Sequence, residues 1–384
     1  MNNKGNKKYN LVSLFAGIGG FELGFKPIAN TVLMCEIDKV AQHVLRSNLS
    51  KIPIVDDVRD LSVLPPNTDI VCAGFPCQDL SSVGIKKGLS GSRSSLIWEV
   101  FRILEINRPE WVIIENVSFM LRLNAGEAIR TITSEFERLG YKWAYRTIDS
   151  ISFVPQHRNR VYVVASLNND PRNVLLSDMS FELTRTIDYS VFKEPIGFYW
   201  TEGKNALGLI SNGIPTLKAG STIGIPSAPA IIYPSGEIFT PDICDAEGLQ
   251  GFPNDWTLPA EEISKASLRW KLIGNAVTVN TVAWIANKII NPKKYDSTKD
   301  VPFVLDNIWP KSAWNVGNGI YVSNTSIYPQ KRHTNLVDFI THEKHPLSIK
   351  ASSGFLKRLD SGRLKHPDYF RKAIIMHINT LNQR

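Results

Sequence analysis

Cys77 lies in the turn Gly74-Phe75-Pro76-Cys77-Gln78, directly after the apolar run of residues 69–73. That run is bounded by turn residues and is typical of a buried strand. Open α/β sheets place their chemistry just past the carboxyl ends of such strands. Pro76 fixes its own φ and restricts Phe75, so the thiol would be held on a rigid turn as a potential nucleophile. The alternative is a small buried apolar residue, which is the commoner role of a free cysteine.

A glycine-rich turn follows the first expected strand, residues 11–15, and leads into a helix that begins near Phe21. Such a turn lets a nucleotide-like ligand approach the backbone at the helix N-terminus, although its spacing is not the dinucleotide pattern GxGxxG. The next strand, residues 31–35, ends at Glu36, about twenty residues later, where an acid can bind ribose hydroxyls. A solvated acid at a strand end is the alternative.

Two further strands also end in acids. The third expected strand ends at Ile54-Val55 and is followed by Asp57, whose carboxylate could accept an adenine amino group. Residues 111–114 form another buried strand, which ends in Glu115. Because helical segments alternate with these strands, we expect a parallel, doubly wound α/β sheet whose carboxyl edge carries the glycine turn, three acids and the thiol.

Two arginines, Arg158 and Arg160, lie between probable strands over 143–148 and 161–165. Two positions apart, they would point to one side of an extended segment. Their guanidinium groups could orient a carboxylate or hold a phosphate. Surface salt bridging is the alternative.

Charge is distributed unevenly along the 384 residues, which are enough for one large domain and a smaller one. Residues 300–384 contain twelve Lys and Arg against six Asp and Glu, whereas the rest of the chain contains 32 against 30. Five of the seven histidines also lie in this last stretch. A basic region on a near-neutral body indicates a polyanionic partner, with a solvated basic face as the alternative.

The four cysteines show no metal-like spacing and no disulfide framework. We therefore expect no metal and a reduced, intracellular setting. The polar and basic N-terminal residues 1–10 precede a glycine-broken stretch that resembles neither a signal peptide nor a membrane span. The expectation is a cytoplasmic, nucleoid-associated protein without membrane contact.

Six ordered motifs resemble those of the C5-cytosine DNA methyltransferases. They are FAGIGG, GFPCQ, ENV, QHRNR, GIPTL, and LQGFP together with LIGNAV, and the resemblance covers about residues 10–165 and 213–290. It implies a Rossmann-like, S-adenosylmethionine-dependent methyltransferase domain with a smaller DNA-recognition region. By the same resemblance Cys77 would add to C6 of a flipped-out cytosine, Glu115 would contact N3 and the exocyclic amine, and Arg160 would hold the base and Glu115. Arg158 is counted with these three as a catalytic residue.

The resemblance also implies the binding residues. The cofactor pocket would consist of Phe15, Gly17, Gly19, Glu36, Asp57, Val58, Pro76, Leu96 and Asn275. Residues near the DNA would be Gln78, Ser81 and Thr216. One position departs from the family pattern: the acid that often stands two residues before Phe15 is Ser13 here.

A second departure concerns the domains. We expect a discontinuous catalytic domain over 1–165 and 213–290, a short variable segment over 166–212, a linker over 291–299, and a basic C-terminal region over 300–384. The usual recognition slot, 166–212, is short for a separate lobe. We therefore expect residues 300–384 to read the target sequence.

The function that follows is a DNA (cytosine-5-)-methyltransferase of a restriction–modification system. It would act as a monomer on double-stranded DNA, with a restriction endonuclease that recognises the same site as a possible partner. The alternatives are a tRNA cytosine-5 methyltransferase of the same fold and a catalytically silent DNA-binding homologue. The Cys-Gln pair after Pro76 and the basic extension favour DNA, and the intact Cys77, Glu115 and Arg160 argue against a silent homologue.

Overall fold

The computed structural model describes residues 8–76, 96–180, 193–204, 206–221, 223–224, 228–304, 308–363 and 366–383. The chain divides into two compact units. Unit 1 contains residues 1–149, 159–181 and 277–330, and unit 2 contains residues 150–158, 182–276 and 331–384. The chain thus enters unit 2 three times.

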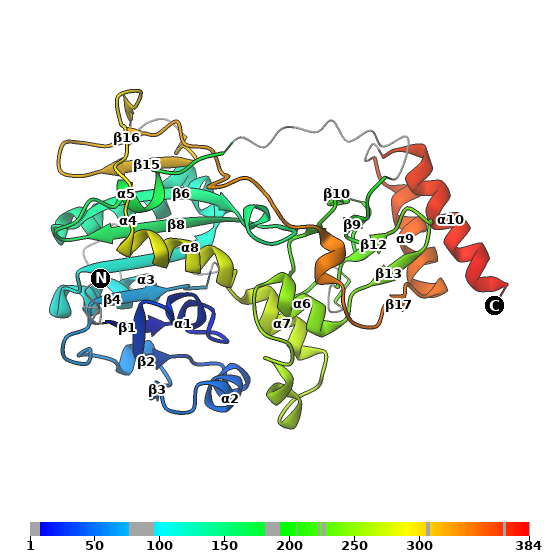
Figure 1. Ribbon diagram of the computed structural model, residues 1–384, viewed down its shortest axis with the longest axis horizontal. Helices are drawn as coiled ribbons and strands as arrows, with labels where there is room; N and C mark the ends of the chain where they lie inside the picture. The colour runs from blue at the N-terminus through cyan, green and yellow to red at the C-terminus, as the bar shows by residue number, and fades with distance from the viewer. Residues whose placement is uncertain are drawn as a thin grey trace, which may run out of the picture. The chain divides into compact units, whose positions relative to one another are not determined.

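Unit 1 is built on a ten-stranded sheet with the order β14-β16-β15-β6-β8-β5-β4-β1-β2-β3 (Figure 1). The five strands from β3 to β5 run parallel, and every pairing from β5–β8 to β16–β14 is antiparallel. The strands are β1 (Tyr9–Leu14), β2 (Ala29–Cys35), β3 (Ile54–Val55), β4 (Ile70–Ala73), β5 (Trp111–Val117), β6 (Lys142–Asp149), β8 (Asn159–Ser166), β14 (Val301–Pro302), β15 (Ser312–Asn315) and β16 (Tyr321–Val322).

Helices cover both faces of the parallel part. Alternate residues of β1, such as Val12 and Leu14, share one apolar core with α3 (Leu96–Asn107) and α4 (Glu127–Arg138). Elsewhere in unit 1, α1 (Gly20–Phe25) packs against α8 (Val279–Ile290), and the two lie side by side in Figure 1. The approach is close, because a Cβ atom on Gly24 would lie 2.4 Å from Val282 Cγ1. The expected doubly wound α/β fold is confirmed.

Smaller elements complete unit 1. The helix α2 (Lys39–Asn48) begins after Asp38, whose carboxylate accepts hydrogen bonds from the N–H groups of Val40 and Ala41. The short helix α5 (Arg172–Leu175) follows β8 and packs against α8.

Residues 291–330 belong to unit 1, although the sequence predicts a boundary at residue 300. Lys293 Nζ lies 3.0 Å from Asp178 Oδ1, and the Tyr295 hydroxyl donates a hydrogen bond to the Asp300 carboxylate, so the segment expected to be a linker is held in place. Beyond it, β15 pairs with β6 along the register Ala313↔Tyr145. The edge of β6 offers unpaired backbone groups, which a later segment of the chain satisfies.

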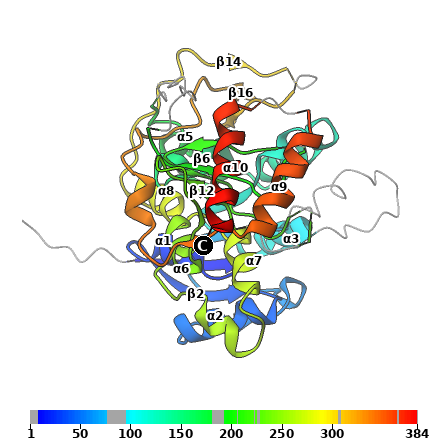
Figure 2. The ribbon, with the colours of Figure 1, turned by 90° about the vertical axis from the view of Figure 1, so that its right-hand side faces the viewer.

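Unit 2 has a five-stranded antiparallel sheet with the order β10-β9-β12-β13-β17. Its strands are β10 (Ile210–Ser211), β9 (Ile196–Phe198), β12 (Ala230–Ile232), β13 (Ile238–Thr240) and β17 (His345–Pro346). The helices α9 (Ile349–Ser361) and α10 (Asp368–Asn382), side by side in Figures 1 and 2, share one apolar core with this sheet. Unit 2 also contains the parallel pair β7 (Gln156–His157) and β11 (Ile214–Pro215), and the helices α6 (Ile243–Leu249) and α7 (Leu268–Asn275).

Within the described ranges, no helix combines the length and apolar character that crossing a lipid bilayer requires. The same part of the chain contains no group of three or more His, Cys, Asp or Glu side chains arranged to hold a metal ion.

Candidate active site at the strand ends of the large sheet

The loop after β1 alternates into the left-handed backbone region. Phe15 has φ 58°, Gly17 has φ 57° and Gly19 has φ 92°. Glycine adopts this region without strain, whereas Phe15 adopts it at a cost. A Cβ atom placed on Gly17 would meet no heavy atom within 4 Å, so there is open space beside the backbone at the start of α1. The loop thus offers a ligand direct access to main-chain atoms.

Glu36 ties this loop to the end of β2. Its Oε2 accepts a hydrogen bond of 2.7 Å from the Gly17 N–H, and its Oε1 accepts one of 2.8 Å from the Asp38 N–H. Burial raises the pKa of the Glu36 carboxyl, and these two backbone donors oppose the rise. Glu36 therefore lies beside Gly17 and fixes the shape of the loop.

Asp57 follows β3 and caps the short 3-10 turn Val58–Asp60. Its carboxylate accepts hydrogen bonds from the guanidinium and the backbone N–H of Arg59, which lower the pKa of Asp57. Val58 is buried. The carboxylate expected to receive an adenine amino group is thus already charged and partnered, and Arg59 is a neighbour that sequence reasoning did not single out.

Glu115 and Asn116, at the end of β5, contact the turn that leads to Cys77. Asn116 Nδ2 donates a hydrogen bond of 3.0 Å to the carbonyl of Phe75. A Cβ atom on Gly74 would lie 3.8 Å from Glu115 Oε2, so the carboxylate sits beside that turn. Sequence reasoning missed the role of Asn116, although its place in the ENV motif was a usable signal. Three predicted residues, Cys77, Gln78 and Ser81, lie outside the described residues.

Arg160 forms an ion pair with Glu115, with 3.1 Å between Arg160 Nε and Glu115 Oε1. It extends from β8, which runs antiparallel to β5 with Arg160 opposite Val117. Both side chains are largely buried, at 15% and 10% exposed, so the attraction is less screened than at the surface. The arrangement aims a fixed carboxylate and a guanidinium at the same strand end.

Three other predicted residues belong to unit 2. Arg158 donates to the backbone carbonyls of Leu217, Gly274 and Ala276, whereas Arg160 pairs with Glu115. The two arginines therefore bind different partners. The Thr216 hydroxyl donates a hydrogen bond of 2.7 Å to the His157 carbonyl, and Asn275 is exposed at the end of α7.

Comparison with known proteins identifies the family. The pattern of the family described as C-5 cytosine-specific DNA methylase matches residues 9–202, about half of the chain. The chain belongs to the C-5 cytosine-specific DNA methylase family. It is a DNA (cytosine-5-)-methyltransferase, and the resemblance read from the sequence motifs is confirmed.

Individual relatives of the methylase agree. The type II methyltransferase M2.BsuMI of Bacillus subtilis is 42% identical to it over 364 residues, which cover 91% of this chain and 92% of the relative. The type II methyltransferase M.Bsp6I of a Bacillus species is 30% identical over 312 residues, covering 73% of this chain and 98% of the relative. The structure of the S. pombe Dnmt2 methyltransferase shares the fold, with TM-score 0.52, 17% identity, and coverage of 74% of this chain and 99% of that chain.

Glu22 is a buried acid of the methylase that sequence reasoning did not assign. It lies in α1, one turn past the glycine loop, and is 4% exposed. Burial raises the pKa of Glu22 to about 7, although its own backbone and the Ser13 hydroxyl act in the opposite direction. An acid directly after a glycine loop, in an otherwise apolar helix start, was the available signal.

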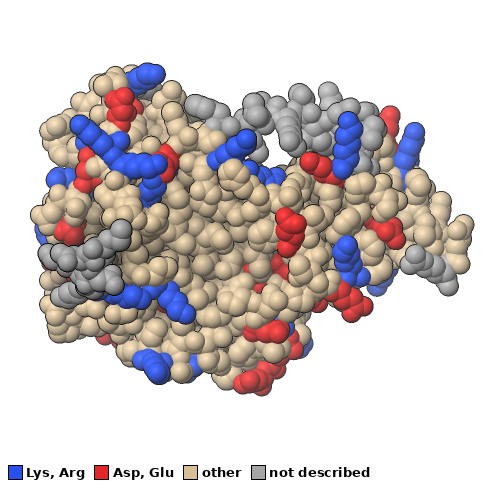
Figure 3. Space-filling view, viewed as in Figure 1, with Lys and Arg blue, Asp and Glu red and all other residues tan. Residues whose placement is uncertain are grey.

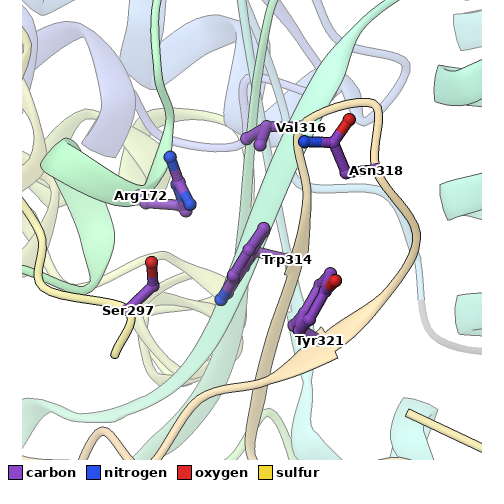
Figure 4. A pocket seen from close by; sticks show the side chains of 6 residues that line it. All are labelled: Arg172, Ser297, Trp314, Val316, Asn318 and Tyr321. Atoms are coloured by element: carbon purple, nitrogen blue, oxygen red, sulfur yellow. The ribbon is translucent and has the colours of Figure 1, made fainter. Parts of the chain in front are cut away.

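A pocket of about 290 Å³ in unit 1 of the methylase lies at the C-terminal strands (Figure 4). The Trp314 ring is stacked on Tyr321, with 4.6 Å between centroids, and the Arg172 guanidinium lies 4.3 Å from the Trp314 ring centroid. Arg172 also pairs with Asp170. The other residues that line the pocket are Ser297, Val316 and Asn318. Arg172, Trp314 and Tyr321 thus contact one another and connect β15 and β16 to the segment that contains α5.

Charge on the face of the methylase shown in Figure 3 is mixed. Blue Lys and Arg side chains are interspersed with red Asp and Glu, and broad areas carry neither.

Proposed function

We propose that this methylase transfers a methyl group from S-adenosylmethionine to C5 of a cytosine flipped out of duplex DNA, through a covalent bond between Cys77 Sγ and C6. The observation that carries the proposal is the Glu115–Arg160 ion pair beside Gly74, in the turn that leads to Cys77. A base inside the duplex stack cannot be approached at C5 and C6, so the target must leave the stack.

Three side chains would share the activation of the base. C5 of cytosine is a poor nucleophile until a nucleophile adds at C6, and a thiolate is both a good nucleophile and a good leaving group. As the Cys77 Sγ–C6 bond forms, electron density moves to C5 and to the ring, where Glu115 contacts N3 and the exocyclic amine. Arg160 keeps the Glu115 carboxylate oriented.

The glycine loop fits the methyl donor. S-adenosylmethionine supplies an electrophilic methyl group on its sulfonium. The open space beside Gly17 leaves room for such a ligand, with Glu36 next to it. After C5 has gained the methyl group, a base removes the C5 proton, the C6–Sγ bond breaks, and Cys77 leaves as thiolate. This restores the aromatic ring and the enzyme.

The remaining binding residues complete the proposal. The cofactor would also contact Phe15, Gly19, Asp57, Val58, Pro76, Leu96 and Asn275, and the DNA would contact Gln78, Ser81 and Thr216. The relatives are named type II methyltransferases, which supports a place in a restriction–modification system beside an endonuclease for the same site. We further propose that it acts as a monomer on double-stranded DNA, and that residues 300–384 contribute more to target recognition than residues 166–212.

Bisulfite sequencing of DNA from cells that express the protein tests this function. We expect 5-methylcytosine at one recurring sequence with the wild type, and none with Cys77→Ser. Purified protein should label duplex DNA but not tRNA with radioactive methyl groups. Labelling of tRNA alone would support the other substrate of this fold, and binding of DNA without any labelling would support a silent homologue.

A further inference from the structure

The helix α7 ends at Asn275, the residue proposed above to contact the cofactor. The last carbonyls of a helix lack partners within it and need others. Here they are met by two side chains from distant parts of unit 2. Gln250 Nε2 donates to Ile273 O at 3.3 Å and to Ala276 O at 2.8 Å, and Arg158 Nη2 donates to Gly274 O at 3.2 Å and to Ala276 O at 2.7 Å.

These two side chains belong to one closed, buried network. Gln156 Nε2 donates to Gln250 Oε1 at 2.8 Å, and Gln156 Oε1 accepts from the Leu217 N–H at 2.9 Å. Arg158 Nη1 donates to the Leu217 carbonyl at 3.1 Å. Gln156 and Gln250 are fully buried, and Arg158 is 2% exposed. The network therefore connects the QHRNR, GIPTL and LQGFP segments to the end of α7.

The backbone around Asn275 has little room to move. A Cβ atom on Gly274 would lie 2.3 Å from the carbonyl carbon of Lys218 and 2.5 Å from Ala219 N, so the turn packs directly on another backbone segment. The neighbours Gly274 and Ala276 are buried, while Asn275 itself is exposed. Its side chain is thus presented from a fixed support.

Charge and shape both favour arginine in this position. A positive group at a helix C-terminus interacts favourably with the helix dipole. The planar guanidinium donates from two nitrogens to three carbonyls at once, which the single ammonium of lysine cannot reproduce in the same geometry. The role differs from that of Arg160, which pairs with Glu115.

We propose that Arg158, supported by Gln250, is a positioning residue for the cofactor: it caps α7 and holds Asn275 in the orientation that binds S-adenosylmethionine. This rests on the proposed function and assigns Arg158 a task other than contact with the cytosine. Loss of the cap should weaken the cofactor complex through Asn275.

The test is a double-mutant cycle on cofactor affinity, measured by calorimetry with S-adenosylmethionine on the full-length protein. Arg158→Lys should raise the Kd about tenfold, a loss of roughly one good hydrogen bond, and Asn275→Ala should raise it by a similar factor. In the double variant the Kd should stay close to that of Asn275→Ala, because residues that act through one another are not additive. In turnover, Arg158→Lys should raise the KM for the cofactor far more than it lowers kcat.

Each outcome has a distinct meaning. Independent, multiplying effects of the two substitutions would show a merely structural role and overturn the inference. If Arg158→Lys leaves the Kd unchanged while Asn275→Ala weakens cofactor binding, the inference is overturned and the methyltransferase proposal stays intact. An unchanged Kd in Asn275→Ala would also overturn the inference. A wild-type protein that does not bind S-adenosylmethionine would refute the proposed function itself. If Arg158→Lys shows no cooperative thermal unfolding transition and so is not folded, Gln250→Met replaces it in the cycle, and the same criteria apply.

Discussion

Arg160 and Glu115 face each other from neighbouring antiparallel strands, with 3.1 Å between Nε and Oε1. The pair fixes a carboxylate at the end of β5, where Asn116 also holds the carbonyl of Phe75. Two adjacent residues of β5 thus have complementary tasks: Glu115 is the candidate acid, and Asn116 holds the turn that precedes the candidate nucleophile.

Arg160→Ala should lower kcat/KM for DNA methylation by about 10²- to 10³-fold, the usual loss when a preorganised charged group near the reacting atoms is removed. Arg160→Lys should restore part of the rate, because the charge returns without the planar guanidinium. Arg138→Ala is the matched control. The Arg138 side chain is 45% exposed and pairs with Glu105 and Glu135, and its loss should change the rate less than twofold. Equal rates in Arg160→Ala and the control would contradict the role.

Cys77 should form the covalent adduct. A duplex whose target cytosine carries fluorine at C5 cannot release its C5 substituent, so the protein should remain bound after denaturation in the presence of S-adenosylmethionine. Cys77→Ser should give no such complex, and Cys244→Ser, a cysteine of unit 2, should trap as well as the wild type. A denaturation-resistant complex of Cys77→Ser as strong as that of the wild type would refute the assignment.

Glu22→Gln should stabilise the protein above neutral pH. Burial raises the pKa of Glu22 from an ordinary 4.5 to about 7, so the folded state holds this proton more tightly than the unfolded state. The stability contributed by the proton is complete below pH 4.5 and is lost as the pH rises to about 7. At pH 8 the variant should gain up to about 3 kcal/mol in the free energy of unfolding.

Urea unfolding at several pH values measures this gain. Glu343→Gln, at an exposed position, is the matched control and should show no such dependence. A stability difference between Glu22→Gln and the wild type that stays constant from pH 5 to pH 8 would contradict the prediction.

A chimaera that tests target recognition by the C-terminal region must also exchange the segment on which that region packs. Phe198 of β9 contacts Phe355 of α9 and Phe370 of α10, each with 5.2 Å between ring centroids. The helices α9 and α10 therefore share their core with a strand that lies more than a hundred positions earlier in the chain. A chimaera that exchanges 300–384 alone would leave mismatched aromatic rings and should be destabilised by several kcal/mol, at about 3–5 kcal/mol per large cavity.

Exchange of residues 193–240 together with 331–383, from a family member with a different target, should preserve folding and transfer the methylated sequence. Bisulfite sequencing reads the result. A third chimaera with residues 166–180 exchanged serves as the control and should keep the original target. If the target moves with 166–180 instead, recognition does not reside in unit 2.

The strand ends were predictable because each lies within a short local pattern. Glu36, Asp57 and Glu115 follow apolar runs. Such a run predicts a strand whatever its position in the sheet. The environment of Arg158 was not predictable in this way. Arg158 lies between β7 and β8, so the period of two that governs an extended strand does not continue through it. Its partners lie 59 to 118 positions away.

The pairing of β15 with β6 was equally hidden from the sequence. Edge pairing depends on which strand still has unpaired backbone groups after the rest of the sheet has formed. No local pattern in residues 312–315 predicts that they pair with β6. The shared core of β9, α9 and α10 depends in the same way on contacts between distant segments. The sequence thus indicated the chemistry of each strand end but not which late segments close the sheets.

The late arrival of β15 has a consequence for synthesis on the ribosome. The Tyr145 hydroxyl donates a hydrogen bond to the carbonyl of Pro310, 165 positions later, and Arg146 donates one to the Ser326 carbonyl. A nascent chain that has reached α8 already contains every residue proposed here for catalysis and cofactor binding. The backbone groups at the edge of β6, however, still lack their partners in β15. Until some forty further residues emerge, that open strand is a template for association with other chains. Premature termination in this interval would yield a chemically complete but aggregation-prone product.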